Sequence, residues 1–176
     1  MSRIPLIDLE KMTDQQREQF DRFPSNLTRG LLLTDHRLST ALPNVANALR
    51  SSGLDPKLRE GVILRVATLM ESAYERMQHL AEAKKVGWSG SDIAAIEQAD
   101  SVALPENFRP VLAFVDACVA APRVPDATFA AARRVLSDRD IATVILLVGH
   151  YMTVARFTAT LEIELDDKPD DWTSEH

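Results

Sequence analysis

The chain has 176 residues, of which 45% are hydrophobic and 26% charged, and its net charge is −6 at pH 7. This composition is typical of one soluble globular domain that is long enough to bury a core. The acidic balance, without a basic stripe carrying interleaved aromatic residues, argues against nucleic acid as a partner. The single cysteine, Cys118, excludes an intramolecular disulfide and a redox-active CxxC pair.

The sequence carries no signal for export or membrane insertion. Its N-terminal segment has no apolar stretch of signal-peptide length and no signal-like cleavage site. The longest apolar run, Val144 to Val148 with its neighbours, is too short to span a bilayer. We therefore expect a cytoplasmic protein with no membrane partner.

Helical periodicity fills nearly the whole first half, and no segment alternates convincingly with the period of a strand. The helices expected there are 13–20, 27–33, 37–50, 56–70 and 72–85. The third is expected to be interrupted near Pro43 and to stop at Gly53. Asp55 as N-cap and Pro56 at the first helical position start the fourth, and Gly87 ends the fifth.

The second half continues the helical pattern, with helices expected at 93–98, 105–121, 127–136 and about 137–162. The stretch Ile141 to Val148 is apolar nearly all round, so the last helix is expected to be central and buried. Acidic residues dominate from Glu164 onward. The sequence thus predicts a single all-α domain over residues 1–167, with a helical extension over about 1–50 and an acidic tail over 168–176.

Glu60, Ser72, Glu75 and His79 form the most informative group of polar residues in the chain. The last three are at positions i, i+3 and i+7 of an expected helix, which places them on one face. Glu60 belongs to the preceding helix and can fold back over them. Two carboxylates, a hydroxyl and an imidazole are the parts needed for general acid–base catalysis.

The same spacing also has a plainer explanation. A Glu–His pair four residues apart on a helix surface stabilises the helix only slightly and occurs by chance. A metal site is a weaker interpretation still, because no second histidine has ligand spacing nearby. Neither a metal nor a cofactor is expected.

Other polar residues allow two interpretations each. His150 and Tyr151 are either hydrogen-bonded core residues or pocket residues, the latter if the last helix packs on the hairpin of the two central helices. Cys118 is expected to be a small buried side chain rather than a reactive thiol. Four basic residues of the hairpin are either solvated or candidates for binding an anionic substrate: Lys57, Arg59, Arg65 and Arg76.

Five segments carry a resemblance to a known family: REGVILRVA (59–67), SAYERMQH (72–79), AKKVGWS (83–89), LSDRD (136–140) and VGHYMTVAR (148–156). Together they resemble the carboxymuconolactone decarboxylase family, whose superfamily also contains the AhpD-like alkyl hydroperoxidases. The resemblance covers roughly residues 26–167. It implies an AhpD-like helical fold with a central hairpin, assembled as a homo-oligomer (a trimer or hexamer) with the site near subunit contacts.

The resemblance also implies what the four polar residues do. In the peroxidase branch, a glutamate, a CxxC pair and a histidine form a proton relay. Glu60 and His79 fall on the relay positions, whereas Ser72 and Glu75 occupy the two cysteine positions. Because a serine hydroxyl cannot cycle through a disulfide, dithiol peroxidase activity is not expected.

The decarboxylase branch lacks the CxxC pair and keeps a glutamate four residues before the histidine, as Glu75 and His79 do. This similarity implies cofactor-independent loss of CO₂ from a small carboxylated or lactone-like metabolite, a reaction of aromatic catabolism. His79, held by Glu75, is then the expected proton donor, with Glu60 and Ser72 in support. Two alternatives stay open: an AhpD-like peroxidase, and a non-catalytic ligand-binding or scaffold protein with no cavity beside His79.

Overall fold

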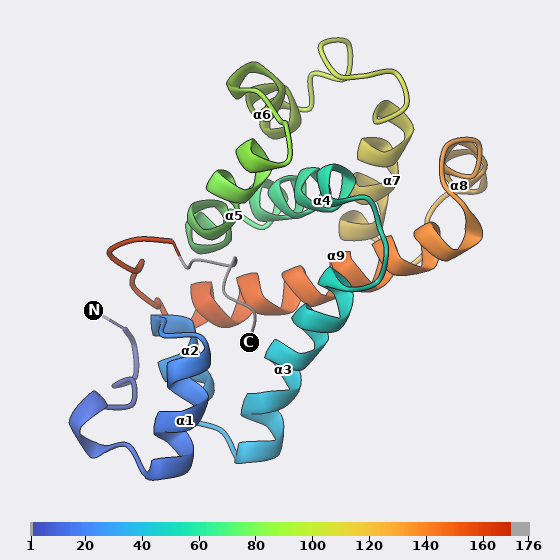
Figure 1. The fold of residues 1–176 in the computed structure, drawn as a ribbon. Coiled ribbons are helices and arrows are strands. Elements are labelled where there is room, and N and C mark those ends of the chain that lie inside the picture. The colour runs from blue at the N-terminus through green and yellow to red at the C-terminus, as the bar shows by residue number, and fades with distance from the viewer. Residues whose placement is uncertain (1, 170–176) are drawn as a thin grey trace.

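The computed structural model describes residues 2–169, and the regular structure in that range is helical throughout (Figure 1). The elements are a short 3₁₀ turn η1 (Leu9–Lys11) and the helices α1 (Asp14–Arg22), α2 (Asn26–Leu31), α3 (His36–Arg50), α4 (Pro56–Leu69), α5 (Ala73–Lys85), α6 (Gly90–Gln98), α7 (Arg109–Ala120), α8 (Asp126–Ala132) and α9 (Asp138–Thr160). The prediction of an all-α fold is confirmed. Most of the acidic tail, residues 170–176, lies outside the described residues.

Helix α3 continues through Pro43, so the predicted interruption is wrong. A proline has no backbone N–H, and the carbonyl four residues earlier, that of Ser39, therefore loses its helical partner. The side chain of Gln19 on α1 donates to that carbonyl at 2.7 Å. A contact between two helices of the extension thus replaces the missing hydrogen bond and keeps α3 whole.

Helices α7 and α8 are each shorter than predicted at one end. Helix α7 begins at Arg109 rather than near residue 105, because Pro110 is tolerated only in the first turn of a helix. Helix α8 ends at Ala132, before the predicted end at Leu136, and residues 133–135 form a turn. The remaining helices follow the predicted order.

Helices α4 and α5 form a central antiparallel hairpin. Helix α4 packs against α5, α6, α7 and α9, and every residue from Glu60 to Ala67 is buried. One end of the hairpin is closed by Trp88, which packs edge-on against Phe108 with ring centroids 4.9 Å apart. Gly61 allows this approach, since an added side-chain carbon there would lie 2.8 Å from Phe108 and 2.9 Å from Trp88.

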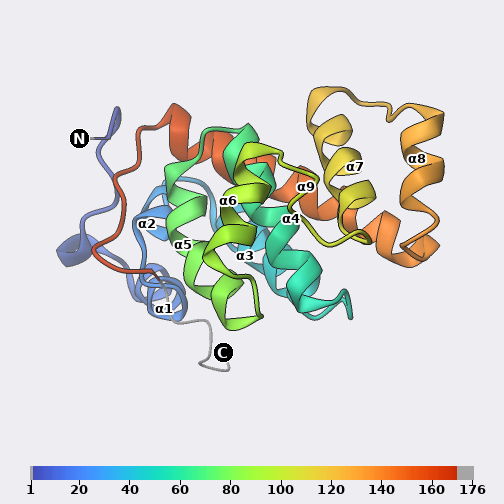
Figure 2. The ribbon, with the colours of Figure 1, turned by 90° about the horizontal axis from the view of Figure 1, so that it is seen from above.

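Helix α9 is the long helix against which the hairpin packs. Figure 2 shows α1 and α2 at one end of the molecule and α7 and α8 at the other, with α9 reaching between them. Within the described residues, α9 is the one helix long and apolar enough to cross a bilayer, but half of its most apolar stretch is buried inside the protein. A buried core helix of this kind is weak evidence for a membrane span. Helix α9 thus has the central position that the sequence predicts.

Candidate functional site

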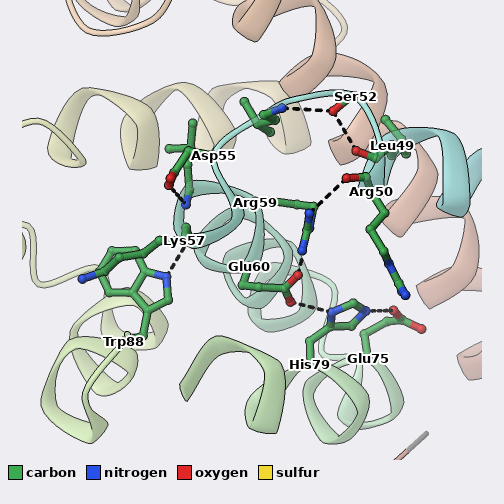
Figure 3. A network of polar contacts seen from close by, with 12 residues as sticks. Leu49, Arg50, Ser52, Asp55, Lys57, Arg59, Glu60, Glu75, His79 and Trp88 are labelled. Carbon is green, nitrogen blue, oxygen red and sulfur yellow. Dashed lines mark hydrogen bonds and ion pairs between the residues drawn. The ribbon is translucent and has the colours of Figure 1, made fainter. Parts of the chain in front are cut away.

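Glu60 and His79 meet across the hairpin. Glu60 lies in the second turn of α4 and His79 in the middle of α5, and Glu60 Oε2 is 2.8 Å from His79 Nδ1 (Figure 3). Both residues are almost completely buried, with exposed fractions of 3% and 4%. Because an ionised carboxylate only accepts hydrogen bonds, we assign the hydrogen to Nδ1. The other ring nitrogen, Nε2, faces Glu75.

Arg59 supports Glu60 from the same helix. Its Nε donates to Glu60 Oε1 at 3.0 Å, and its guanidinium also donates to the backbone carbonyl of Arg50 at 3.3 Å. Burial alone would raise the pKa of Glu60, but the hydrogen bond and charge of His79, with those of Arg59, outweigh it and lower that pKa. Glu60 is consequently ionised at neutral pH.

Glu75 lies on the other side of the imidazole. Its Oε2 is 3.8 Å from His79 Nε2, beyond hydrogen-bonding distance. Burial raises the pKa of Glu75 to about 7, although the charge of His79 opposes the shift. The short contact that orients the ring is thus made by Glu60, and Glu75 is a carboxyl group that changes protonation near neutral pH.

Ser72 is the N-cap of α5 and precedes its first helical residue. Its hydroxyl accepts a hydrogen bond from the backbone N–H of Glu75 at 3.3 Å. This role uses the hydroxyl to complete the first turn of the helix. The structure therefore brings Glu60, Glu75 and His79 together, and it places Ser72 beneath Glu75 as a helix cap.

Helix α9 contributes His150 and Tyr151 to the same region. The ring of Tyr151 packs edge-on between two imidazoles, at 5.0 Å from His79 and 5.1 Å from His150. Burial lowers the pKa of His150 to about 4, helped by the charge of His79, so His150 is neutral at pH 7. Burial, with the charges of Glu75 and Glu60, raises the pKa of Tyr151 well above its usual value. Both α9 residues thus face the hairpin site as neutral polar groups.

A small hollow of about 60 Å³ lies between these groups, and we call it the His79 hollow. Its volume corresponds to a few water molecules and is below that of typical ligand pockets. A metabolite can therefore enter only if the walls move apart. The lining residues come from the extension, α5 and α9: Ser25, Leu27, Ala46, Tyr74, Glu75, Gln78, His79, His150, Tyr151 and Val154.

Asp166, in the segment after α9, fastens the outer wall of the His79 hollow. Its carboxylate accepts hydrogen bonds from the Tyr74 hydroxyl, from Gln78 Nε2 at 2.9 Å and from the backbone N–H of Asn26 at 2.7 Å. The segment from Glu164 is therefore docked at this point, although its composition suggests a loosely held tail. Gln78 is three residues from Glu75, and helical spacing alone could have identified it; nothing local singles out Asp166.

The four basic residues of the hairpin are engaged elsewhere or in support of Glu60. Arg65 forms a bidentate pair with Asp116, and Arg76 pairs with Glu97 at 2.6 Å. Lys57 lies over the Trp88 ring, 4.6 Å from its centroid. None of these four residues lines the His79 hollow.

Cys118 lines a different and larger hollow, of about 550 Å³, which we call the Cys118 hollow. It is formed by α7, α8 and α9 with the segment that joins α7 to α8, and its lining includes Phe114, Phe129, Ile145 and Val148. Burial raises the pKa of the Cys118 thiol, which disfavours the reactive thiolate. Among residues 2–169, no group of three or more His, Cys, Asp and Glu side chains is arranged to hold a metal ion.

A family comparison matches part of the chain. Residues 37–117, from the start of α3 to α7, match the model of the carboxymuconolactone decarboxylase family. The matched range contains Glu60, Ser72, Glu75 and His79, and α9 lies outside it. No protein among the curated ones is similar enough in sequence to count as a match.

Solved structures share the fold. An uncharacterised peroxidase-related protein from Ralstonia eutropha JMP134 with an AhpD core has a TM-score of 0.79 and 20% identity, over 94% of this chain and 93% of that one. An AhpD-type protein of unknown function from Agrobacterium tumefaciens has a TM-score of 0.68 and 24% identity, over 73% and 90%. A variant of the debrominase Bmp8 in complex with 2,3,4-tribromopyrrole has a TM-score of 0.75 and 13% identity, over 95% of each chain. These similarities confirm the predicted AhpD-like fold.

Proposed function

We propose that the chain is a cofactor-independent acid–base enzyme, a proposal supported by the match of residues 37–117 to the carboxymuconolactone decarboxylase family model and by the AhpD-like fold. Its proposed substrate is a small carboxylated or lactone-like metabolite. One observation carries the proposal: the imidazole of His79 lies between an ionised carboxylate and a carboxyl group whose pKa is about 7, beside the His79 hollow. A scaffold protein would have no need of such a group next to an internal space.

Each group has a distinct proposed task. Glu60 holds the Nδ1 hydrogen, fixes the orientation of the ring and stabilises the imidazolium when it forms. His79 Nε2 faces Glu75, and we assign the delivery of a proton to a substrate in the hollow to these two groups acting together. Because the pKa of Glu75 is near 7, both of its protonation states are populated at neutral pH. Ser72 supports Glu75 as a helix cap and does not contact the substrate.

For a decarboxylation, the steps balance without a cofactor. The bond between the substrate carboxylate carbon and its neighbour breaks, CO₂ leaves, and the electron pair stays on the lactone as a dienolate. Tyr151, which stays neutral, and the His79 ring both line the hollow, and we assign to them the stabilisation of the oxyanion of that dienolate. One proton from the His79–Glu75 pair is then added to a carbon of the dienolate, and solvent returns the proton to the enzyme.

Redox chemistry is the less favoured alternative. The similar structures include a peroxidase-related protein and a debrominase, but one fold supports many activities and does not choose between them. A dithiol reaction needs a thiolate and a second thiol. Cys118 is the only cysteine, and it lines a different hollow.

The remaining expectations of the sequence form part of the same proposal. We propose a cytoplasmic homo-oligomer, a trimer or hexamer, whose partner is a small molecule rather than nucleic acid or membrane. Light scattering coupled to size-exclusion chromatography measures the oligomer directly, and a monomer at micromolar concentration would contradict this part.

The reaction is tested with γ-carboxymuconolactone as substrate, and turnover is measured as the release of CO₂. The variants His79→Gln and Glu75→Gln should each lower kcat by about 10²–10⁴-fold, because each removes a group that transfers the proton. Cys118→Ser is the matched control in the other hollow and should keep wild-type turnover. Near-normal rates in both site variants would disprove the acid–base roles. Wild-type protein that binds carboxylated lactones but turns none over would favour the non-catalytic alternative.

A further inference from the structure

Three buried polar side chains of the His79 hollow have no hydrogen-bond partner within residues 2–169. They are Glu75, His150 and Tyr151, whose exposed fractions are only 4%, 8% and 8%. Buried polar groups nearly always have a partner, because an unpaired one destabilises the folded state. Three such groups around one internal space are therefore better explained by a ligand than by the fold.

Other polar groups of the same hollow do have partners. The hydroxyl of Tyr74 donates to Asp166, and Gln78 Nε2 donates to the same carboxylate at 2.9 Å. The tyrosine of α5 is thus fastened to the C-terminal segment, whereas the hydroxyl of Tyr151 on α9 has no partner among the described residues. The unpaired polar groups therefore belong chiefly to the α9 wall of the hollow.

The α9 pair is held in place by contacts between rings. Tyr151 packs edge-on against His150 at 5.1 Å and against His79 at 5.0 Å, and His79 is itself fixed by Glu60. Sequence spacing allows two interpretations of His150 and Tyr151, as hydrogen-bonded core residues or as pocket residues. Their burial without a hydrogen bond in the described part of the chain favours the second interpretation.

The α9 wall offers hydrogen-bond donors to a ligand. Tyr151 keeps its hydroxyl hydrogen at neutral pH, and the neutral ring of His150 carries one N–H. None of the described residues that line the hollow is a lysine or an arginine, and ionised Glu60 lies next to His79. An anionic group would therefore meet negative charge with little solvent screening. The group that fits is an uncharged acceptor, and a carbonyl oxygen can accept from two donors at once.

We propose that His150 and Tyr151 bind the carbonyl oxygen of a substrate that reacts through its enolate, so that His150 is a further substrate-binding residue. This inference rests on the proposed function and names the part of the substrate that enters the hollow: an uncharged ketone or ester carbonyl rather than a carboxylate. When the reacting bond breaks, its electron pair is delocalised onto this oxygen, and the two donors stabilise the charge that develops there. Addition of a proton to carbon restores the carbonyl.

Thermal stability separates this proposal from a structural role. Tyr151→Phe removes only a hydroxyl without a partner, so the melting temperature should stay within about 1 °C of wild type or rise by up to about 4 °C. Tyr74→Phe is the matched variant in the same hollow, and loss of its hydrogen bond to Asp166 should lower the melting temperature by about 2–4 °C. Equal falls in the two variants would show that the Tyr151 hydroxyl has a structural role and would overturn the proposal.

Binding of a small uncharged ketone tests the site without turnover. The probe is cyclopentanone, and tetrahydrothiophene is the matched comparison, because its ring has the same size and its sulfur is only a weak acceptor. Dissociation constants are measured by NMR titration of wild type, Tyr151→Phe, His150→Leu and His36→Leu, together with the nitrogen signals of the imidazole rings. His36 lies at the exposed start of α3, so His36→Leu makes the same change away from the hollow.

Wild type should bind cyclopentanone more tightly than tetrahydrothiophene, and only the ketone should shift the ring nitrogen signals of His150. Tyr151→Phe and His150→Leu should each weaken ketone binding by about 3–10-fold, as expected for one neutral hydrogen bond, and change binding of the comparison ring by less than about 2-fold. His36→Leu should change neither constant. Ketone binding that neither α9 variant weakens, or no ketone binding to wild type, would overturn the proposal.

This inference and the proposed function can fail separately. Ketone binding through His150 and Tyr151 without any turnover would refute the proposed function alone. Turnover that depends on His79, with unchanged kcat and KM in both α9 variants, would refute this inference alone.

Discussion

The Cys118 hollow and the His79 hollow differ in size and in the ionisable groups that line them. The Cys118 hollow is the larger, about 550 Å³ against about 60 Å³, and it is walled mainly by apolar side chains. The His79 hollow contains two imidazoles, two phenols and a carboxyl group with a strongly raised pKa. Size alone would select the first hollow, whereas the density of perturbed ionisable groups selects the second.

The two hollows also differ in how the chain builds them. Neighbouring helices α7, α8 and α9 form the Cys118 hollow. The His79 hollow needs three regions that are far apart in the sequence: the extension, α5 and α9. The extension therefore forms part of the candidate site, because three of its residues line the hollow.

The largest effect on stability is expected from Glu60→Ala. The substitution leaves His79 and Arg59 without their shared buried partner, and loss of one member of a buried ion pair costs about 3–5 kcal/mol. Urea unfolding measures the change. Glu82→Ala removes a partly exposed pair with Lys85 and should cost less than about 1 kcal/mol. If both variants lost the same free energy of unfolding, the buried Glu60 contacts would stabilise the fold no more than the exposed ion pair does.

A pH-dependent gain in stability is expected from Glu75→Gln. The pKa of Glu75 is about 7 in the folded protein against an ordinary value of 4.5, so its stability contribution is full below pH 4.5 and is lost as pH rises through 7. Gln removes that loss, and at pH 8 the variant should be more stable by about 3 kcal/mol. The gain should shrink to a few tenths of a kcal/mol at pH 4.5. A gain that is independent of pH would contradict the burial of an ionisable carboxyl group.

The smallest effect on stability is expected from Cys118→Ala in the larger hollow. The side chain is only partly buried, so its truncation should cost about 1 kcal/mol or less. Peroxide consumption with a dithiol donor should be absent in wild type and variant alike. Consumption that disappears with Cys118 would reverse the comparison and make the larger hollow the reactive one.

Much of the fold could be predicted because its signals are local. Asp55 and Pro56 start α4 by capping chemistry that needs only adjacent residues, and the same holds for Ser137 and Asp140 at α9. The error at Pro43 shows the limit, because the compensating hydrogen bond comes from another helix.

The sequence predicts which residues come together at the candidate site better than it predicts which contacts each of them makes. Helical spacing places Glu75 and His79 one turn apart, but only the packing of the hairpin decides that Glu60 makes the short contact. The raised pKa of Glu75 results from burial, which no local pattern encodes. Asp166 could not be found in advance, since its hydrogen-bond partners at the site come from distant segments.

Asp166 has a consequence for the order in which the protein is completed during synthesis. Its three hydrogen bonds span 88, 92 and 140 residues of chain, and contacts of such long range form late. While the ribosome still holds Asp166, the hairpin with Glu60, Glu75 and His79 has already emerged. The hydrogen bonds that fasten the outer wall of the His79 hollow can therefore form only after the hairpin has left the ribosome.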